Sequence, residues 1–385
     1  GSPPVGLIVA TGNVGTPLGV RVFATLDPTD GHQLRRYTMT AAAVAYDEQT
    51  DLWYIFESGN VPPIPTQPMT LHVGRIDAKT GIYTELHTLD GIPVLRDANT
   101  VAVLNHRLVY RAYDPTSDAG FMAPLGLAVI DTTNPQPAIA SFGGFLSVQT
   151  FFGFIPLRAT GIDGGTLNLV IQETCTTSCP VDRLQVTFPS DPSVSPGVSS
   201  TKWLSATIPL PPNEGSIAAA WAPRVKGSPE DLLIWPPDAM GTDATIRAFN
   251  PNSQLQNGSD ITFSAPGSNQ FFAAVVDECD DVLVASEQQN KALWAVSLTN
   301  PGQATSASTS DPAQVLGFEP VTKTVLVPLH LQGVPLLGYA LTVDGSGNPT
   351  LAPRSTGWSP PSDLVVDAVT VKRLTDYSAS TCGAL

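Results

Sequence analysis

The sequence is poor in basic residues, and this shortage excludes several kinds of partner. Its 385 residues include 19 Lys and Arg against 34 Asp and Glu, which gives a formal net charge of −15. An acidic surface repels the phosphates of nucleic acids and anionic lipid headgroups. We therefore expect no nucleic-acid partner. The few basic residues are mostly Arg, and with abundant Ala and Pro this is typical of a GC-rich bacterial genome.

Long hydrophobic runs and helical periodicity are also missing. No run of 18 apolar residues occurs, so we expect no membrane insertion of the mature chain. No stretch of three or more helical turns places apolar residues at a spacing of 3.6. Instead, 36 Pro and 32 Gly separate short runs of Val, Ile, Thr and aromatic residues. This pattern is typical of strands joined by turns, and it predicts an all-β protein.

One segment recurs along the chain: a strand that ends in apolar residues and runs into a turn of Asp, Asn, Pro or Gly. Copies follow one another at about 45 to 60 residues, a period typical of repeat architectures. They begin at Val22, His72, Leu127, Leu184, Thr245, Leu293 and Gly338. A second strand pair precedes most copies, with Asp-Glu-x-x-Asp in its turn at 47–51 and again at 277–281. We interpret these carboxylates as parts of solvated turns, so each repeat predicts four antiparallel strands.

Radial repetition of four-stranded sheets protects their edges, so we predict a seven-bladed β-propeller of four-stranded antiparallel blades. One inner strand, 364–373, remains after the last copy, whereas the start of the chain offers three strands without an inner one. We expect one C-terminal strand plus three N-terminal strands to close the last blade. We treat 1–385 as a single β-propeller domain, with 1–2 as a cloning remnant and 374–385 as a C-terminal tail.

The turn after the third strand carries a family resemblance. The segment RIDAKTG, from Arg75 to Gly81, resembles the repeats of the quinoprotein-like and YVTN-type propeller superfamilies. The resemblance covers only the few residues around each turn. The Trp-x-x-x-x-Gly pattern of quinone-cofactor propellers, the kelch double glycine and the WD dipeptide are missing. The resemblance therefore implies the superfamily and no particular family.

The chain has only four cysteines, and their positions predict two disulfides. Cys175 and Cys179 enclose a tight loop between two strand-like runs, and a zinc site would need two further ligands that the sequence does not place at metal spacing. Cys279 lies in the first hairpin of its repeat. Cys382 lies in the tail, which leaves the last inner strand on the same face of a propeller and spans roughly 30 Å when extended. We therefore predict a Cys279–Cys382 disulfide.

Disulfides form in oxidising compartments, so we expect an exported protein that is extracellular, at the cell surface or periplasmic. Ligands usually bind propellers at loops on one face. A long loop at 112–126 and a moderate one at 235–245 combine aromatic rings, which stack on sugars, with carboxylates, which accept hydroxyl hydrogens. The candidate ligand-binding residues are Tyr113, Asp114, Asp118, Phe121, Trp235 and Asp238, together with His330 on the same face. The alternative is that Trp235 and Phe121 cap the core beneath their own loops.

Catalytic motifs are scarce. There is no G-x-S-x-G, no HExxH, no P-loop and no GxGxxG after a strand, and the five histidines are scattered. We expect no catalytic residues, no metal ligands and no cofactor. Calcium at DGSGN, from Asp344, is the alternative, although that segment lacks a distal Glu and is typical of a simple turn.

These observations favour a non-catalytic binding module, secreted or at the cell surface, that recognises a glycan or an extracellular protein through loops on one face. A secreted polysaccharide hydrolase or lyase is one alternative, and it requires carboxylates that converge at the channel mouth. A structural subunit of a surface appendage or envelope complex is the other, and it requires a large exposed apolar patch.

Overall fold

Almost all regular structure in the computed structural model is β-strand. It describes residues 5–58, 68–95, 101–113, 125–133, 140–143, 155–163, 166–172, 181–189, 194, 196–203, 220–222, 232–240, 242–249, 258–267, 271–300, 302–374 and 379–382. Within these ranges one short helix occurs, α1 (Ala379–Cys382). None of the described helical structure is long and apolar enough to cross a bilayer. The all-β prediction is confirmed.

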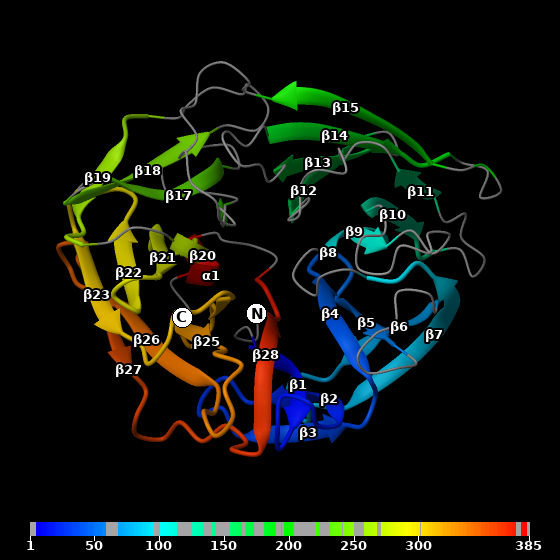
Figure 1. Cartoon of the computed structure of the whole chain (residues 1–385), viewed down its shortest axis with the longest axis horizontal. Helices are drawn as coiled ribbons and strands as arrows, with labels where there is room; N and C mark the ends of the chain where they lie inside the picture. Colours follow the sequence, from blue (N-terminus) through cyan, green and yellow to red (C-terminus); the bar gives the residue numbers. More distant parts are fainter. Residues whose placement is uncertain are drawn as a thin grey trace.

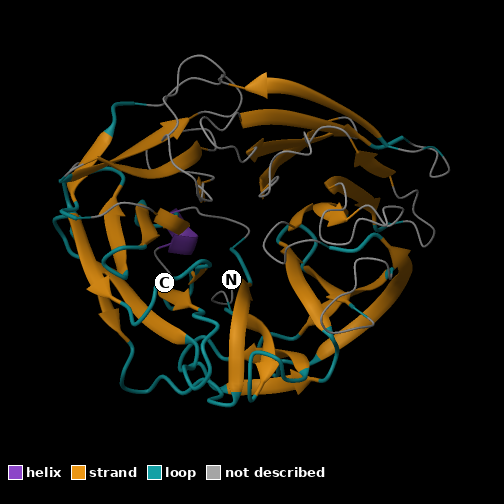
Figure 2. Ribbon diagram, in the orientation of Figure 1, coloured by secondary structure: helices purple, strands orange, loops and turns teal. Residues whose placement is uncertain are grey.

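The strands pair in chain order into four-stranded antiparallel sheets (Figures 1 and 2). One sheet contains β4 (Ala41–Asp47), β5 (Leu52–Glu57), β6 (Met69–Ile76) and β7 (Tyr83–Ile92). The next two contain β8 (Val101–Leu104), β9 (Arg107–Tyr113), β10 (Leu125–Asp131) and β11 (Ala140–Gly143), then β12 (Ile155–Asp163), β13 (Thr166–Gln172), β14 (Val181–Thr187) and β15 (Gly197–Trp203).

The remaining sheets before the closing one follow the same plan. They contain β16 (Ala220–Ala222), β17 (Leu232–Met240), β18 (Asp243–Phe249) and β19 (Ile261–Ser264); β20 (Phe271–Asp277), β21 (Val282–Glu287), β22 (Ala292–Ser297) and β23 (Ala304–Ser308); and β24 (Gly317–Glu319), β25 (Thr324–Val327), β26 (Leu337–Val343) and β27 (Pro349–Pro353). Each recurrent turn segment of the sequence follows the third strand of its sheet, as predicted.

The two ends of the chain share one sheet. Strand β28 (Leu364–Val371) pairs with β1 (Ile8–Val14), which is followed by β2 (Arg21–Leu26) and β3 (Gln33–Tyr37). This closing sheet confirms the prediction of one C-terminal strand combined with three N-terminal strands. The first strand of each sheet contacts the first strand of the next sheet, and β28 contacts both β4 and β24. The inner strands therefore form a closed ring, with the outer strands at the periphery (Figure 1).

Both faces of the sheet β4–β7 are apolar because it packs between two neighbouring sheets. Along β5, Trp53 and Ile55 face the closing sheet, where Phe23 stacks on Tyr37 with ring centroids 4.5 Å apart. The alternate residues Tyr54 and Phe56 face the other way and join the core with the sheet β8–β11. Burial of each such side chain contributes about 1.5–3 kcal/mol. This explains why the strands are almost continuously hydrophobic.

The predicted disulfide between Cys279 and Cys382 is confirmed. It joins the hairpin between β20 and β21 to α1, with the two Cα atoms 5.4 Å apart. The other predicted pair, Cys175 and Cys179, lies outside the described residues. One loop expectation is wrong. Residues 235–240 belong to β17, because a register shift between Trp235 and Asp238 accommodates two prolines and lets the strand continue.

Candidate functional site

The candidate site begins at a bulge in the innermost strand of the closing sheet. Thr11 of β1 lies opposite Ala368, but the next residue, Gly12, lies opposite Val366, so Asp367 is an extra residue in β28. A bulge of this kind changes the direction of a side chain and recurs next to active sites. A Cβ atom on Gly12 would lie 2.2 Å from the Val365 carbonyl oxygen. Only glycine therefore permits this close approach of β1 to β28.

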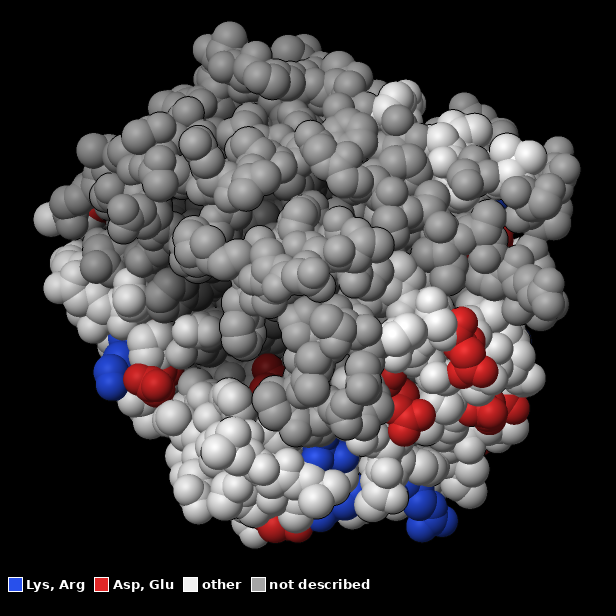
Figure 3. Space-filling view, turned by 45° about the vertical axis from the view of Figure 1, so that its right-hand side comes forward, with Lys and Arg blue, Asp and Glu red and all other residues white. Residues whose placement is uncertain are grey.

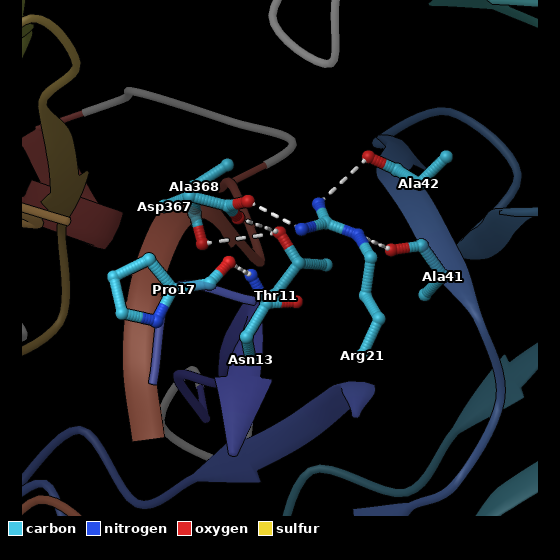
Figure 4. A network of polar contacts seen from close by, with 8 residues as sticks. All are labelled: Thr11, Asn13, Pro17, Arg21, Ala41, Ala42, Asp367 and Ala368. Atoms are coloured by element: carbon cyan, nitrogen blue, oxygen red, sulfur yellow. Dashed lines mark hydrogen bonds and ion pairs between the residues drawn. The ribbon is translucent and has the colours of Figure 1, made fainter. Parts of the chain in front are cut away.

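Asp367 pairs with Arg21, the first residue of β2 (Figure 4). The Asp367 carboxylate accepts a hydrogen bond from Arg21 Nη1 at 2.5 Å and another from the Thr11 hydroxyl at 3.1 Å. Arg21 also donates from Nε to the Ala41 carbonyl at 2.5 Å and from Nη2 to the Ala42 carbonyl at 3.2 Å. Ala42 is itself a bulged residue, of β4. The guanidinium is thus held between two neighbouring inner strands.

The Arg21–Asp367 pair has hydrogen-bond donors that a ligand could use. The side chains of Arg21 and Asp367 are 15% and 21% exposed, so both are accessible although largely enclosed. A guanidinium carries five N–H groups, and the three bonds above leave two without a partner among the described residues. An ion pair with spare donors is suited to bind a carbonyl or carboxylate oxygen.

Asn13 adds an unused acceptor beside this pair. It lies opposite Arg21 in the β1–β2 pairing and is only 5% exposed. Its Nδ2 donates to the Pro17 carbonyl at 2.6 Å, whereas its Oδ1 has no hydrogen-bond partner among the described residues. A buried acceptor left unsatisfied costs about 1–3 kcal/mol. A hydroxyl or a water molecule held at this position would remove that cost.

A second polar group lies on the same inter-sheet boundary. His72 of β6 bonds through Nδ1 to Glu85 at 2.6 Å and through Nε2 to Glu57 at 2.8 Å. Each ring nitrogen of His72 is thus hydrogen-bonded to a different carboxylate. Glu57 lies opposite Ala41, the residue whose carbonyl accepts from Arg21. The histidine therefore orients two carboxylates near the Arg21 side of the boundary.

The structure places the sequence-predicted site residues in different environments. Tyr113 is the last residue of β9, and Asp114, Asp118 and Phe121 lie outside the described residues. Trp235 and Asp238 lie in a strand, as described above. His330 is exposed, and its N–H donates to the Val366 carbonyl at 3.1 Å, directly beside Asp367. Of the predicted set, His330 thus contacts β28 through its backbone, at the residue that precedes Asp367.

Asp344, the predicted calcium alternative, caps its own turn. Its carboxylate accepts the N–H groups of Ser346 and Asn348 at 2.8 and 2.9 Å, as well as the side-chain amide of Asn348. These bonds lower the pKa of Asp344, the Asn348 side chain most strongly. On the face seen in Figure 3, the described residues form small acidic patches and small basic patches, with no large area of one charge.

Sequence reasoning missed Arg21, Asp367, Thr11 and Asn13. Arg21 and Asp367 are separated by 346 residues, so no local motif joins them. One signal was available: Asp367 is the only charged residue in the inner strand LVVDAVTV, whose other residues are apolar apart from Thr370. A carboxylate in such a strand is costly to bury without a partner, so its presence indicates that a cation or hydrogen-bond donor lies beside it.

Solved structures support the fold. The chain resembles a proposed 6-phosphogluconolactonase from Bacteroides uniformis with a TM-score of 0.59 and 13% identity, over 95% of this chain and 99% of the other. It resembles a periplasmic gluconolactonase from Pseudomonas aeruginosa with a TM-score of 0.58 and 12% identity, over 96% and 99%. Dihydro-heme d1 dehydrogenase NirN matches with a TM-score of 0.50 and 10% identity, over 94% and 74%. Neither protein-family models nor curated proteins match the sequence. The fold is of the β-propeller type.

The prediction of a non-catalytic binding module is wrong by this comparison. Two of the structures that match nearly the whole chain bear the names of enzymes, a proposed 6-phosphogluconolactonase and a periplasmic gluconolactonase. The physical reason for the error is that a propeller assembles a site from different blades. The absence of contiguous catalytic motifs therefore does not argue against an enzyme on this fold.

Proposed function

We propose that the protein is an exported lactonase, built on a seven-bladed β-propeller that comprises a single domain. The Arg21–Asp367 pair, presented at a bulge beside the unsatisfied Asn13 oxygen, is the observation that carries this proposal. The similarity in fold to two gluconolactonases adds support. The ring of inner strands and the sheet shared by both ends of the chain support the seven-bladed closure. The Cys279–Cys382 disulfide supports export to an oxidising compartment.

The geometry suits hydrolysis of a cyclic ester. Water adds to the lactone carbonyl carbon, the ring C–O bond breaks, and the product is a hydroxy acid. Asp367 accepts the proton of the attacking water as a general base. The two spare N–H groups of Arg21 stabilise the negative charge that develops on the carbonyl oxygen. Asn13 Oδ1 accepts a hydrogen from the water and orients it, and the proton is finally delivered to the ring oxygen as it leaves.

The test measures acid release from δ-gluconolactone, δ-valerolactone and δ-decalactone, each compared with its spontaneous hydrolysis. Asp367→Asn keeps the shape of the side chain but removes the base, and we expect kcat to fall about 100-fold or more. The matched control is Asp363→Asn. Asp363 lies just before β28 and pairs with Arg36 through two hydrogen bonds of 2.6 and 2.7 Å, which lower its pKa.

We expect Asp363→Asn to retain the rate of the wild type. The proposal is refuted if the wild-type protein accelerates none of the three lactones. It is refuted equally if Asp367→Asn and Asp363→Asn have the same kcat, because the effect would then reflect loss of any ion pair in the closing sheet.

A further inference from the structure

Exposed apolar side chains occur in the two connections that lead to the Arg21–Asp367 pair or bond to its strand. Among the described residues, the large apolar side chains that are exposed are Val5, Leu18, Val20, Ile82, Leu86, Val194 and Leu331. Leu18 and Val20 are 92% and 67% exposed and immediately precede Arg21 in the chain. Leu331, at 36%, follows His330, whose N–H bonds to the residue before Asp367. We call Leu18, Val20 and Leu331 the apolar rim.

The loop that carries Leu18 is held firmly. The Val14 N–H donates to the Val20 carbonyl at 2.9 Å, and the Gly15 N–H donates to the Asp363 carbonyl at 2.7 Å. Within the loop, the Asn13 side chain donates to the Pro17 carbonyl at 2.6 Å, and a further backbone bond closes the turn. Because the loop is tied to β28 and to itself, Leu18 is presented to solvent by the fold.

The two sides of the apolar rim come from neighbouring sheets. Leu18 and Val20 belong to the connection between β1 and β2, and Leu331 belongs to the connection between β25 and β26. The first connection bonds to the Asp363 carbonyl, just before β28, and the second bonds to the Val366 carbonyl within β28. Leu18 and Val20 are therefore close to Arg21 along the chain, and Leu331 lies in a connection that bonds to β28 at the residue before Asp367.

We infer that the site takes an amphiphilic ligand, whose carbonyl or carboxylate binds Arg21 and whose alkyl chain covers the apolar rim. As a statement about substrate, this rests on the proposed lactonase function: the substrate class is a lactone that carries an alkyl or acyl chain. As a statement about binding, it stands without catalysis. Each methylene that leaves water on binding strengthens affinity by up to about fourfold. A chain of several carbons therefore dominates the affinity.

The binding test uses isothermal titration calorimetry with two probes, butyrate and decanoate, below the concentration at which decanoate forms micelles. We expect decanoate to bind at least about 30-fold more tightly than butyrate. In Leu18→Ser/Val20→Ser this ratio falls at least about tenfold, because the loop keeps its backbone bonds but loses its apolar surface. The matched control Ile82→Ser/Leu86→Ser changes two exposed apolar residues near β7 and keeps the wild-type ratio.

Equal affinities for the two probes overturn the inference, and so does an unchanged ratio in the Leu18→Ser/Val20→Ser variant. Measuring lactone hydrolysis as well distinguishes a failure of this inference from a failure of the proposed lactonase function. Faster turnover of δ-decalactone than of δ-valerolactone, lost in that variant, supports both. Decanoate binding without hydrolysis of any lactone supports the amphiphile site and overturns the lactonase. Hydrolysis without preference for the longer chain overturns the amphiphile site and leaves the lactonase standing.

Discussion

Replacing the buried carboxylate of Asp277 should stabilise the protein in a pH-dependent way. Asp277 ends β20 and is 2% exposed. Its Oδ1 accepts the N–H groups of Cys279 and Asp280 at 3.0 and 3.4 Å, whereas Oδ2 has no hydrogen-bond partner among the described residues. Burial raises its pKa from 3.8 to about 6, although the Lys323 ammonium opposes the rise. The charged form is therefore disfavoured in the folded state.

The sign and magnitude of this change in stability follow from the linkage between protonation and folding. Because the folded pKa exceeds the unfolded one, the contribution of this group to stability is complete below pH 3.8 and is lost as the pH rises to about 6. A shift of about two pKa units corresponds to a cost of about 3 kcal/mol at pH 8, and about half of that at pH 5. Asp277→Asn removes the charge and keeps the Oδ1 acceptor. We expect its gain in unfolding free energy to be about 1.5 kcal/mol larger at pH 8 than at pH 5.

Urea titrations at pH 5 and pH 8 measure this difference while staying above the sequence pI of about 4.5. The control is Asp47→Asn, at the equivalent end of β4. There Oδ1 accepts from Gln49, and Oδ2 accepts from the Thr50 hydroxyl at 2.8 Å and the His106 N–H at 2.9 Å. An amide cannot accept at both positions, so Asp47→Asn should destabilise by about 1–3 kcal/mol at either pH. If Asp277→Asn also destabilises equally at both pH values, the linkage argument is refuted.

Three further outcomes are expected. Gly12→Ala places a Cβ against the Val365 carbonyl and should displace the bulge. The proposed lactonase activity should then fall while the circular dichroism spectrum stays close to that of the wild type. Full activity would show that the bulge does not position Asp367. Cys279→Ser/Cys382→Ser removes a disulfide between residues 103 positions apart and should lower the unfolding free energy by about 2–5 kcal/mol. An unchanged urea midpoint would contradict this. Tyr37→Phe removes a hydroxyl that donates to the Gly81 carbonyl and accepts the N–H of Tyr83. We expect the unfolding free energy to fall by about 1–3 kcal/mol in the same titration. Tyr339→Phe, whose hydroxyl makes one hydrogen bond, should lower it less.

Most of the fold was predictable from local pattern. The turns that recur after each third strand show where strands end. The apolar runs between them show where strands lie, because a strand that packs between two sheets needs apolar residues on both faces. The unmatched inner strand at 364–373 predicted the shared closing sheet. The Cys279–Cys382 bond was predictable as well, because the place of a residue within a repeat determines the face on which it lies.

The candidate site was not predictable in this way. The pairing of Arg21 with Asp367 depends on closure of the ring, which brings residues 346 positions apart within hydrogen-bond distance. It depends also on a bulge, which shifts the register by one residue and leaves no trace in a strand that is apolar on both faces. The same physics explains Trp235 and Asp238, which Pro236 and Pro237 marked as loop residues although a register shift keeps them in β17. The sequence by itself determined the strands, their order and the closure, because these follow from local periodicity and turn chemistry. Only the tertiary structure decided which polar groups meet, because that depends on packing between blades.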